Sequence, residues 1–166
     1  NLSVAVYGKD ARFVAGIVQS PENVVPCATF YDSGDEARIF PINRNGQVLR
    51  AVWQKEEAGI KIPDAVNIDW EDISADNNNN LIIGAFGNNN SSRRDLAIYI
   101  LKDPKPKFTS ITRIFQKIPF YFPEQKSFPD PSMNFDCEAV FTANNKIYLL
   151  TKHRTDPNTC LYRFDS

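Results

Sequence analysis

A seven-residue motif occurs twice in this chain. Residues 67–73 read Asn-Ile-Asp-Trp-Glu-Asp-Ile, and residues 134–140 read Asn-Phe-Asp-Cys-Glu-Ala-Val. Both copies have the order Asn, apolar, Asp, any residue, Glu, any residue, β-branched apolar, at an offset of 67 residues. Chance rarely keeps three polar identities and two apolar classes in register. We therefore expect an internal structural repeat within one domain spanning residues 1–166, with units that begin near residues 67 and 134.

The residues after each copy also correspond. A polar turn comes first, then an apolar run, and then a third run with Tyr near its middle. These runs are 81–86 and 96–101 after the first copy, and 146–151 and 160–164 after the second. Short β-rich runs separated by Asn, Gly and Pro predict antiparallel strands joined by hairpins.

The rest of the chain has similar patterns. Residues 32–35 and the Asn-Gly sequence within 43–46 predict tight turns. The pattern blurs over 54–64, where one helical turn can form, and 109–122 is a long Ile- and Phe-rich run that predicts a bent outer strand. Further strands are expected over 11–18, 24–31, 36–42 and 47–53.

This pattern predicts an all-β chain with roughly a dozen strands. Repeated four-stranded antiparallel sheets are typical of a β-propeller, and a dozen strands make about three blades. A blade of 67 residues is longer than usual and implies a long outer excursion. A β-sandwich is the main alternative, although a sandwich does not ordinarily repeat a polar Asp-x-Glu at the start of successive units.

Composition excludes several classes of function. The 166 residues are 42% hydrophobic, which is enough for one packed core. Nineteen Lys and Arg face 20 Asp and Glu, so no overall field attracts nucleic acid or an anionic membrane. No run approaches the roughly 18 apolar residues of a membrane helix, and we expect no membrane insertion. Residues 2–7 alternate like a strand and lack the pattern of a signal peptide, so we expect any such peptide to be removed or absent.

Three cysteines, Cys27, Cys137 and Cys160, cannot all pair within one chain. Cys137 and Cys160 fall in the first and third runs of one repeat unit, and the first and third strands of a meander are not adjacent. We expect buried free thiols, while the disulfide state stays open.

Five segments resemble a known family when taken in order. They are Phe30-Tyr31-Asp32-Ser33-Gly34-Asp35, Ala37-Arg38-Ile39-Phe40, the 67–73 motif, Gly84-Ala85-Phe86-Gly87-Asn88-Asn89 and Asp136-Cys137-Glu138-Ala139. Together they are similar to a group of mostly secreted bacterial β-propeller proteins with the pattern N-D-S-G-D, D-W-E-D, G-D-I-G-D-N and D-A-E-A. The chain departs from that pattern at Tyr31, Ala85 and Asn88, and two expected acids are absent at the last two positions.

The resemblance covers residues 28–164 and implies a secreted or periplasmic location. It also implies a protein longer than this chain. Three blades would leave two apolar sheet faces open, and soluble domains rarely tolerate that. We therefore expect another segment, a companion chain or self-association to complete the fold.

The repeated acids are the candidate metal ligands: Asp69, Glu71, Asp72, Asp136 and Glu138. On a strand Asp69 and Glu71 share one face, and we expect both to converge with Asp136 and Glu138. So many like charges require a cation, protonation or basic partners. Calcium is the expected cation because it accepts oxygen ligands in irregular geometry. Two other roles stay open, namely loop capping at blade junctions and direct catalysis.

A second set of polar residues is the candidate ligand-binding set: Asp32, Asp35, Asn88, Asn89, Arg93 and Lys152. Arg93 and Arg94 follow an Asn-rich loop in which amides and a guanidinium can hold a polar ligand. The alternative is an exposed hairpin with two solvated arginines. Arg38 and Arg154 are further basic candidates.

Nucleophilic catalysis and zinc have little support in the sequence. The single histidine, His153, comes without a Ser or Cys partner pattern, and the cysteines lack zinc spacing. Trp53 and Trp70 are expected to be packing residues. Two functions remain: a non-catalytic extracytoplasmic module that binds an unknown small molecule or protein, and a calcium-dependent propeller hydrolase of esterase, lactonase or phosphoesterase type.

Overall fold

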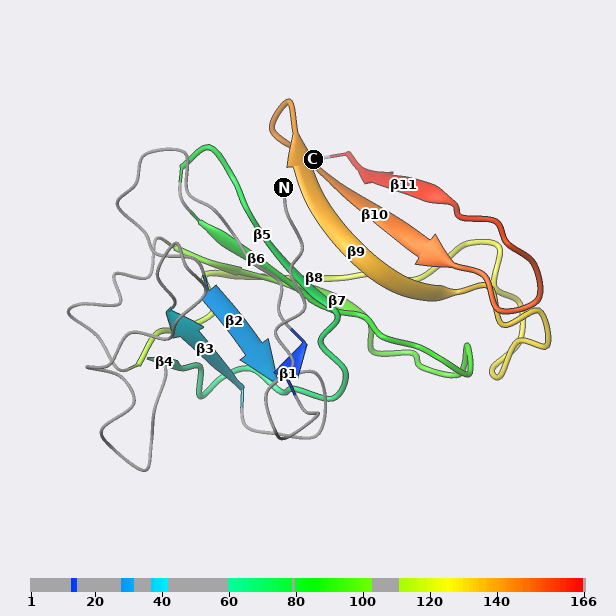
Figure 1. Cartoon of the computed structure of the whole chain (residues 1–166), viewed down its shortest axis with the longest axis horizontal. Helices are drawn as coiled ribbons and strands as arrows, with labels where there is room; N and C mark the ends of the chain where they lie inside the picture. The colour runs from blue at the N-terminus through cyan, green and yellow to red at the C-terminus, as the bar shows by residue number, and fades with distance from the viewer. Residues whose placement is uncertain are drawn as a thin grey trace.

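Three antiparallel sheets make up the described part of the chain (Figure 1). The computed structural model describes residues 13–14, 28–31, 37–41, 60–78, 80–102 and 111–165. Within these ranges there are eleven strands and no helix. The strands are β1 Phe13–Val14, β2 Ala28–Tyr31, β3 Arg38–Pro41, β4 Ile60–Lys61, β5 Asp72–Ala75, β6 Leu81–Ala85, β7 Ala97–Leu101, β8 Gln116–Pro119, β9 Asp136–Ala143, β10 Lys146–Lys152 and β11 Leu161–Phe164.

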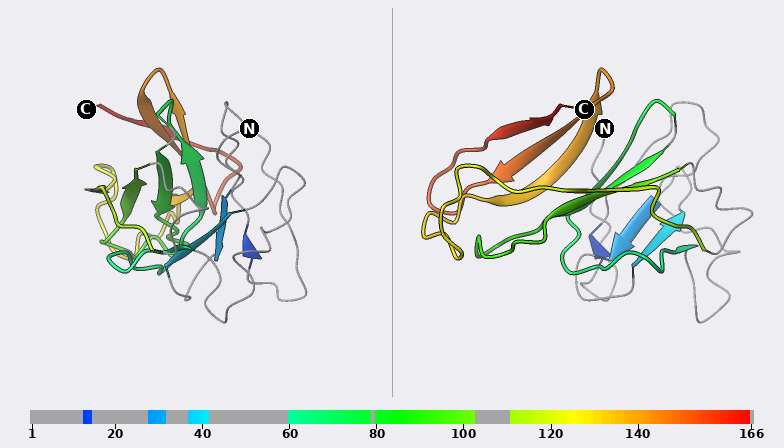
Figure 2. Two further views of the ribbon diagram at one scale, coloured as in Figure 1. Left: turned by 90° about the vertical axis from the view of Figure 1, so that its left-hand side faces the viewer. Right: turned by 180° about the vertical axis from the view of Figure 1, so that it is seen from behind.

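Each sheet is a meander of strands that are consecutive in the sequence. The orders are β1-β2-β3-β4, β5-β6-β7-β8 and β11-β10-β9, and every pairing is antiparallel. The all-β prediction is therefore confirmed. Figure 2 shows the β5–β8 sheet between the other two. No sheet closes on itself in the described residues.

The middle of the β5–β8 sheet is buried on both faces because β6 and β7 carry apolar residues on both sides, whereas β8 is mostly exposed. All five residues of β6 are buried. Alternate residues therefore enter different cores. Leu81 and Ile83 join a cluster with residues of β3 and β4, whereas Ile82 and Phe86 join a cluster with residues of β9 and β10.

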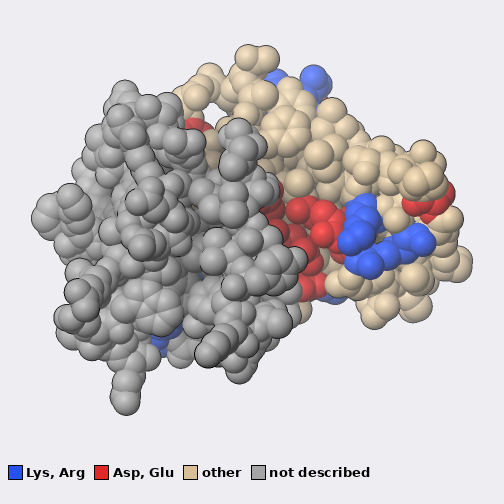
Figure 3. All heavy atoms as spheres, viewed as in Figure 1, with Lys and Arg blue, Asp and Glu red and all other residues tan. Residues whose placement is uncertain are grey.

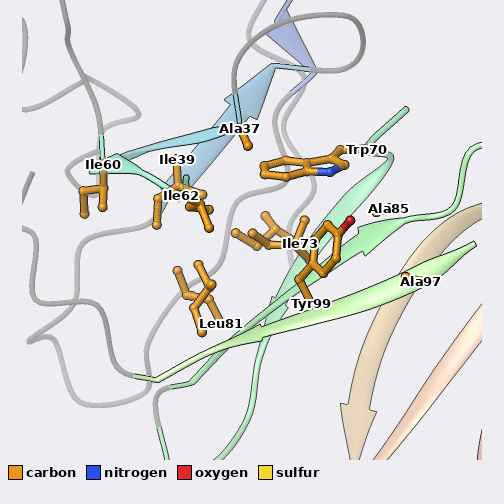
Figure 4. Close-up of a cluster of buried hydrophobic side chains, with 12 residues drawn as sticks. Ala37, Ile39, Ile60, Ile62, Trp70, Ile73, Leu81, Ala85, Ala97 and Tyr99 are labelled. Atoms are coloured by element: carbon orange, nitrogen blue, oxygen red, sulfur yellow. The ribbon is translucent and has the colours of Figure 1, made fainter. Parts of the chain in front are cut away.

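The first core fixes the repeated motif. Trp70 is fully buried, its ring meets that of Tyr99 edge-on at 6.2 Å, and its Nε1 donates to the Val66 carbonyl at 3.2 Å. Figure 4 shows Trp70 and Tyr99 beside Ile39 and Ile73. Trp70 is thus a packing residue, as expected, and Trp53 lies outside the described residues.

In the second core, Gly84 is required by a close approach. A Cβ atom there would lie 2.1 Å from the ring of Phe86, two residues later on the same face of the strand. Glycine therefore leaves the volume that the fully buried Phe86 fills.

One sequence expectation is wrong in detail, and another, the possible helical turn over 54–64, lies partly outside the described residues. The outer strand predicted over 109–122 is only β8, four residues long, because Ile111 instead forms a parallel bridge with Lys61. The blurred region over 54–64 contributes β4 and a turn at Pro63–Asp64 in its described part. Residue ranges 11–12, 15–18, 24–27 and 47–53, which belong to other predicted strands, lie outside the described residues.

Candidate functional site

The two copies of the motif meet at one end of neighbouring strands. In the second copy Asp136 opens β9, whereas in the first Asp69 and Glu71 immediately precede β5. This stretch still runs along β6, since Glu71 N donates to the Gly84 carbonyl and Gly87 N donates to the Asp69 carbonyl. Asp69 and Glu71 therefore come from one sheet, and Asp136 and Glu138 come from the adjacent sheet. Figure 3 shows Asp and Glu atoms directly beside Lys and Arg atoms near the middle of the view.

Asp69 and Glu71 converge on Gly87. A Cβ atom built on Gly87 would lie 2.3 Å from Asp69 Oδ2 and 2.4 Å from Glu71 Oε1. The two carboxylates thus share one side of the chain, as the alternation of a strand predicts. Glycine at position 87 provides the space for both oxygens.

Asp136 is the most buried acid of the group, with a relative exposure of 0%. Its Oδ1 accepts from the main-chain N–H of Asn88 at 2.7 Å, and its Oδ2 accepts from Arg154 Nη2 at 2.5 Å. The same guanidinium donates to Asn89 Oδ1. A buried carboxylate is costly unless it is paired and hydrogen-bonded, and both conditions are met here.

Glu138 lies at the rim of this cluster. Its Oε1 is 3.1 Å from Lys152 Nζ and 3.6 Å from an Arg154 nitrogen. The hydrogen bond that Arg154 donates to Asp136 raises the pKa of that guanidinium, and the charges of Glu138 and Glu71 act in the same direction. Arg154 and Lys152 therefore supply the positive charge that the repeated acids require.

Asp72 has a different environment. Its Oδ2 accepts from Val140 N of β9 at 2.8 Å, and its Oδ1 accepts from Ile73 N at 2.9 Å. Burial raises the pKa of Asp72 to about 6, although the two hydrogen bonds act in the opposite direction. Asp72 thus links β5 to β9 and does not face the Asp69–Glu71 pair.

The Asn-rich loop is ordered by its own polar contacts. Asn88 Oδ1 accepts from the main-chain N–H groups of Ser92 and Arg93, and its Nδ2 donates to the Phe135 carbonyl. Arg93 Nη1 donates to the Gly87 carbonyl at 2.6 Å, and its Nε lies 3.0 Å from Asp95. The loop therefore holds Gly87 and Asn88 in place beside the acids.

The alternative of two solvated arginines is wrong for Arg93. Its side chain is only 16% exposed, because it closes the loop onto the end of β6. Arg94 is exposed, and its guanidinium lies 3.9 Å from the centre of the Phe128 ring. Asp32 and Asp35 lie outside the described residues, while Arg38 is buried in β3.

The thiols differ from one another. Cys137 is a buried free thiol, as expected, and burial raises its pKa far above the usual range. Cys160 is free but exposed, so the expectation of burial is wrong there. Strand β10 separates the two residues, as the meander predicts. Cys27 lies outside the described residues.

The sequence identified the acids but not two of the residues that organise them. The sequence marks Arg154 only as one of several basic candidates, and no pattern in it assigns a role to Gly87. A usable signal exists, since Lys152 and Arg154 have the same two-residue spacing as Asp136 and Glu138 on the paired strand. Matching spacing of opposite charges on two strands of a hairpin predicts cross-strand pairs.

The five candidate metal ligands do not form one centre in the described structure. Asp72 faces β9, and Asp136 and Glu138 face Arg154 and Lys152. Among the described residues, no group of three or more His, Cys, Asp or Glu side chains is placed to hold a metal ion. Asp69 and Glu71 remain the pair whose oxygens converge.

The described residues also include no helix long and apolar enough to cross a membrane.

Comparison with models of protein families, with curated proteins and with solved structures finds no match to this chain. The family resemblance therefore depends on the five sequence segments alone.

Proposed function

We propose that this chain is a non-catalytic, extracytoplasmic binding module of β-propeller type. The polar face formed by Asp69, Glu71, Glu138, Asn89, Lys152 and Arg154, with the buried Asp136 and Asn88 behind it, would be its ligand-binding surface. One observation carries the proposal: Asp136 and Glu138 of the second copy pair with one arginine, Arg154, and the charge of Glu71 from the first copy helps to raise the pKa of the same guanidinium. The face offers carboxylates, a guanidinium and amides, which suit a polar small molecule or a polar segment of a protein.

The propeller part of the proposal has separate support. Four-stranded meanders that stack face to face are the units of a propeller, and the central sheet here is covered on both sides by neighbouring sheets. The motif recurs at the same edge of two of these sheets. A secreted or periplasmic location follows from the resemblance.

Binding is favoured over hydrolysis because Asp136, the buried acid behind the polar face, already accepts hydrogen bonds on both oxygens. Both oxygens of Asp136 accept hydrogen bonds from the chain itself, so a substrate would have to displace one of them. His153 pairs with Asp156 at 3.0 Å within its own loop. A general base has to reach the proton that it removes, and neither residue is placed for that.

Calcium is a narrower part of the proposal. Asp69 and Glu71 supply two hard oxygen ligands beside Gly87, and water and main-chain oxygens would have to complete the six to eight ligands that calcium takes. When bound, the ion would neutralise two like charges that lie close together.

A titration of isotopically labelled protein followed by amide chemical shifts tests the polar face. The probes are calcium chloride, neutral sugars, amino acids and phosphomonoesters. We expect saturable shifts at Asn88 and Asn89 with at least one probe class, and loss of these shifts in R154M with K152M. The matched control R163M changes an exposed arginine elsewhere and should leave them intact.

Turnover assays separate binding from hydrolysis. We expect no calcium-dependent cleavage of an ester, a lactone or a phosphomonoester. Cleavage that disappears in D69N with E71Q would replace the binding module with the hydrolase. Absence of saturable shifts with every probe class would remove the polar face as a binding surface.

A further inference from the structure

A cavity of about 770 Å³ lies between the β5–β8 sheet and the β9–β11 sheet. It adjoins the β5–β6 turn and the β9–β10 turn, at the opposite end of these hairpins from the polar face. The β9–β10 turn projects at the top of Figure 1. Binding sites for small molecules commonly measure about 300–1,000 Å³, so this cavity has the size of a ligand site.

Apolar side chains line the cavity from both sheets. Ile82, Ile100 and Ile118 come from β6, β7 and β8, and Ile147 and Phe164 come from β10 and β11. Four of them, all except Ile82, remain only partly buried at the edge of the second core. A ligand that covers them gains about 25 cal/mol for each Å² of apolar surface removed from water.

The polar groups at the cavity are mostly amides. Asn77 Nδ2 donates to Asn145 Oδ1 at 3.3 Å and thereby joins the two turns. Gln116 adds a third side-chain amide from β8. Amides donate and accept hydrogen bonds without net charge, and can orient a hydroxyl or amide group of a ligand.

The charged groups at the cavity are already ion-paired or hydrogen-bonded within the chain. Lys146 Nζ lies 3.0 Å from Asp165 Oδ1. Asp76 accepts hydrogen bonds from the main-chain N–H groups of Asn78 and Asn80 and from the Asn80 side chain. A charged ligand would therefore lose its hydration and find only opposite charges that already have partners, which is unfavourable.

We propose that this cavity binds a small uncharged molecule with an aliphatic or aromatic body and a hydrogen-bonding group. The site is separate from the polar face, so its ligand and the ligand of that face differ in chemistry. The apolar walls would enclose the body, and the amides of the two turns would bind the polar group.

Fluorescence titration of the intact protein with N-phenyl-1-naphthylamine, a neutral apolar dye, tests this site. We expect saturable enhancement. Q116W places a bulky ring in the cavity from an exposed position of β8, and it should weaken dye binding at least tenfold without unfolding the protein. V66W is the matched control, since Val66 is 62% exposed and lies outside the cavity, and it should bind as the wild type does.

Charge selectivity gives a second readout. The anionic dye 8-anilinonaphthalene-1-sulfonate should bind at least tenfold more weakly than the neutral dye. Equal affinity for the two dyes, or equal affinity in Q116W and V66W, would overturn the proposal. Dye release as the protein concentration rises, with a dimer in sedimentation, would assign the cavity to a second copy of the chain and also overturn it. None of these outcomes involves the polar face, so the two proposals fail separately.

Discussion

At the scale of single residues, the acids of the two motif copies have three different environments. Asp136 has a guanidinium and a main-chain N–H, and Asp72 has two main-chain N–H groups. Asp69 and Glu71 occupy the space that Gly87 leaves open. Substitutions in this region should therefore have separate signatures.

Removal of the Arg154 guanidinium should destabilise the fold. In R154M the fully buried Asp136 keeps only the Asn88 N–H, and a buried polar group that loses a partner costs about 1–3 kcal/mol. Urea unfolding measures the change. The control R163M removes a solvent-exposed pair with Asp165 and should leave the free energy of unfolding unchanged. Equal effects of the two substitutions would contradict the assigned role of Arg154.

A methyl group at position 87 should also be destabilising. In G87A the new Cβ atom would meet oxygens of Asp69 and Glu71 at 2.3 and 2.4 Å, so the carboxylates have to move. Overpacking of this kind costs about 1–3 kcal/mol. Thermal unfolding of G87A, and of G87A with E71A, gives the measurement. The second change should recover part of the loss, and no recovery would show that the strain lies elsewhere.

The sequence predicted that the two motif copies lie at corresponding strand ends, but not how Lys152 reaches Glu138. The two-residue turn at Asn144 and Asn145 sets the register, and an unbroken ladder from it would place Lys152 opposite Cys137. A register shift between Leu150 and Thr151 places Lys152 opposite Asp136. Directly opposite residues share a face, so one inserted residue brings the lysine to the acids. No local sequence pattern predicts such a bulge.

At the scale of strands, the contact between β5 and β9 joins two sheets through side chains. Asp72 accepts from Val140 N, and Thr142 Oγ1 donates to the Ala75 carbonyl at 2.8 Å. Runs 81–86, 96–101, 146–151 and 160–164 were predictable, because short β-rich runs between turn residues are typical of strands, and they agree with β6, β7, β10 and β11. The short β8 was not, since the bridge between Ile111 and Lys61 depends on a distant segment.

Stability should depend on pH through Asp72. Its pKa is about 6 in the folded protein and 3.8 as the ordinary value, so the folded state binds the extra proton between these limits. The contribution of Asp72 to the free energy of unfolding is fully present below about pH 4. It is lost as the pH rises through 6, and the free energy of unfolding falls by roughly 2–3 kcal/mol. D72N should lack this part of the pH dependence. Parallel curves of free energy of unfolding against pH for the two proteins would refute this prediction.

The central strand β6 should tolerate truncation poorly. Ile83 has no exposed surface, so I83A leaves a cavity in the first core and should cost about 2–5 kcal/mol. Ile68 is 47% exposed, and I68A is the control, with an expected change below about 0.5 kcal/mol. Urea unfolding compares the two. A cost for I83A as small as that of I68A would mean that the first core is loosely packed.

At the scale of the whole molecule, the β9–β11 sheet has one face against β5–β8 and another that carries apolar side chains. Phe141 and Tyr148 stack at 5.1 Å there, and Leu161, which is 59% exposed, lies on the same face opposite Leu150. The register places Ala139 and Leu150 on the same face. A partly exposed apolar face of this kind marks a surface for association.

We expect concentration-dependent association through this face. Sedimentation velocity should show species larger than the 18.8 kDa chain as the concentration rises, and L161K should reduce them. I111K is the control, because Ile111 is 54% exposed but lies elsewhere. A strictly monomeric wild type would instead show that this face is stable in water.

The meander order of the sheets has a consequence for local unfolding. Among the described residues, each ladder is formed by strands that are consecutive in the sequence, and β9–β11 contribute no main-chain ladder to another sheet. Residues 136–164 can therefore open as one cooperative unit while the β5–β8 ladder persists. Native-state hydrogen exchange should then group the amides of β9, β10 and β11 at one opening free energy, below that of β6. The third sheet would then open and close again at a lower free-energy cost than the central sheet.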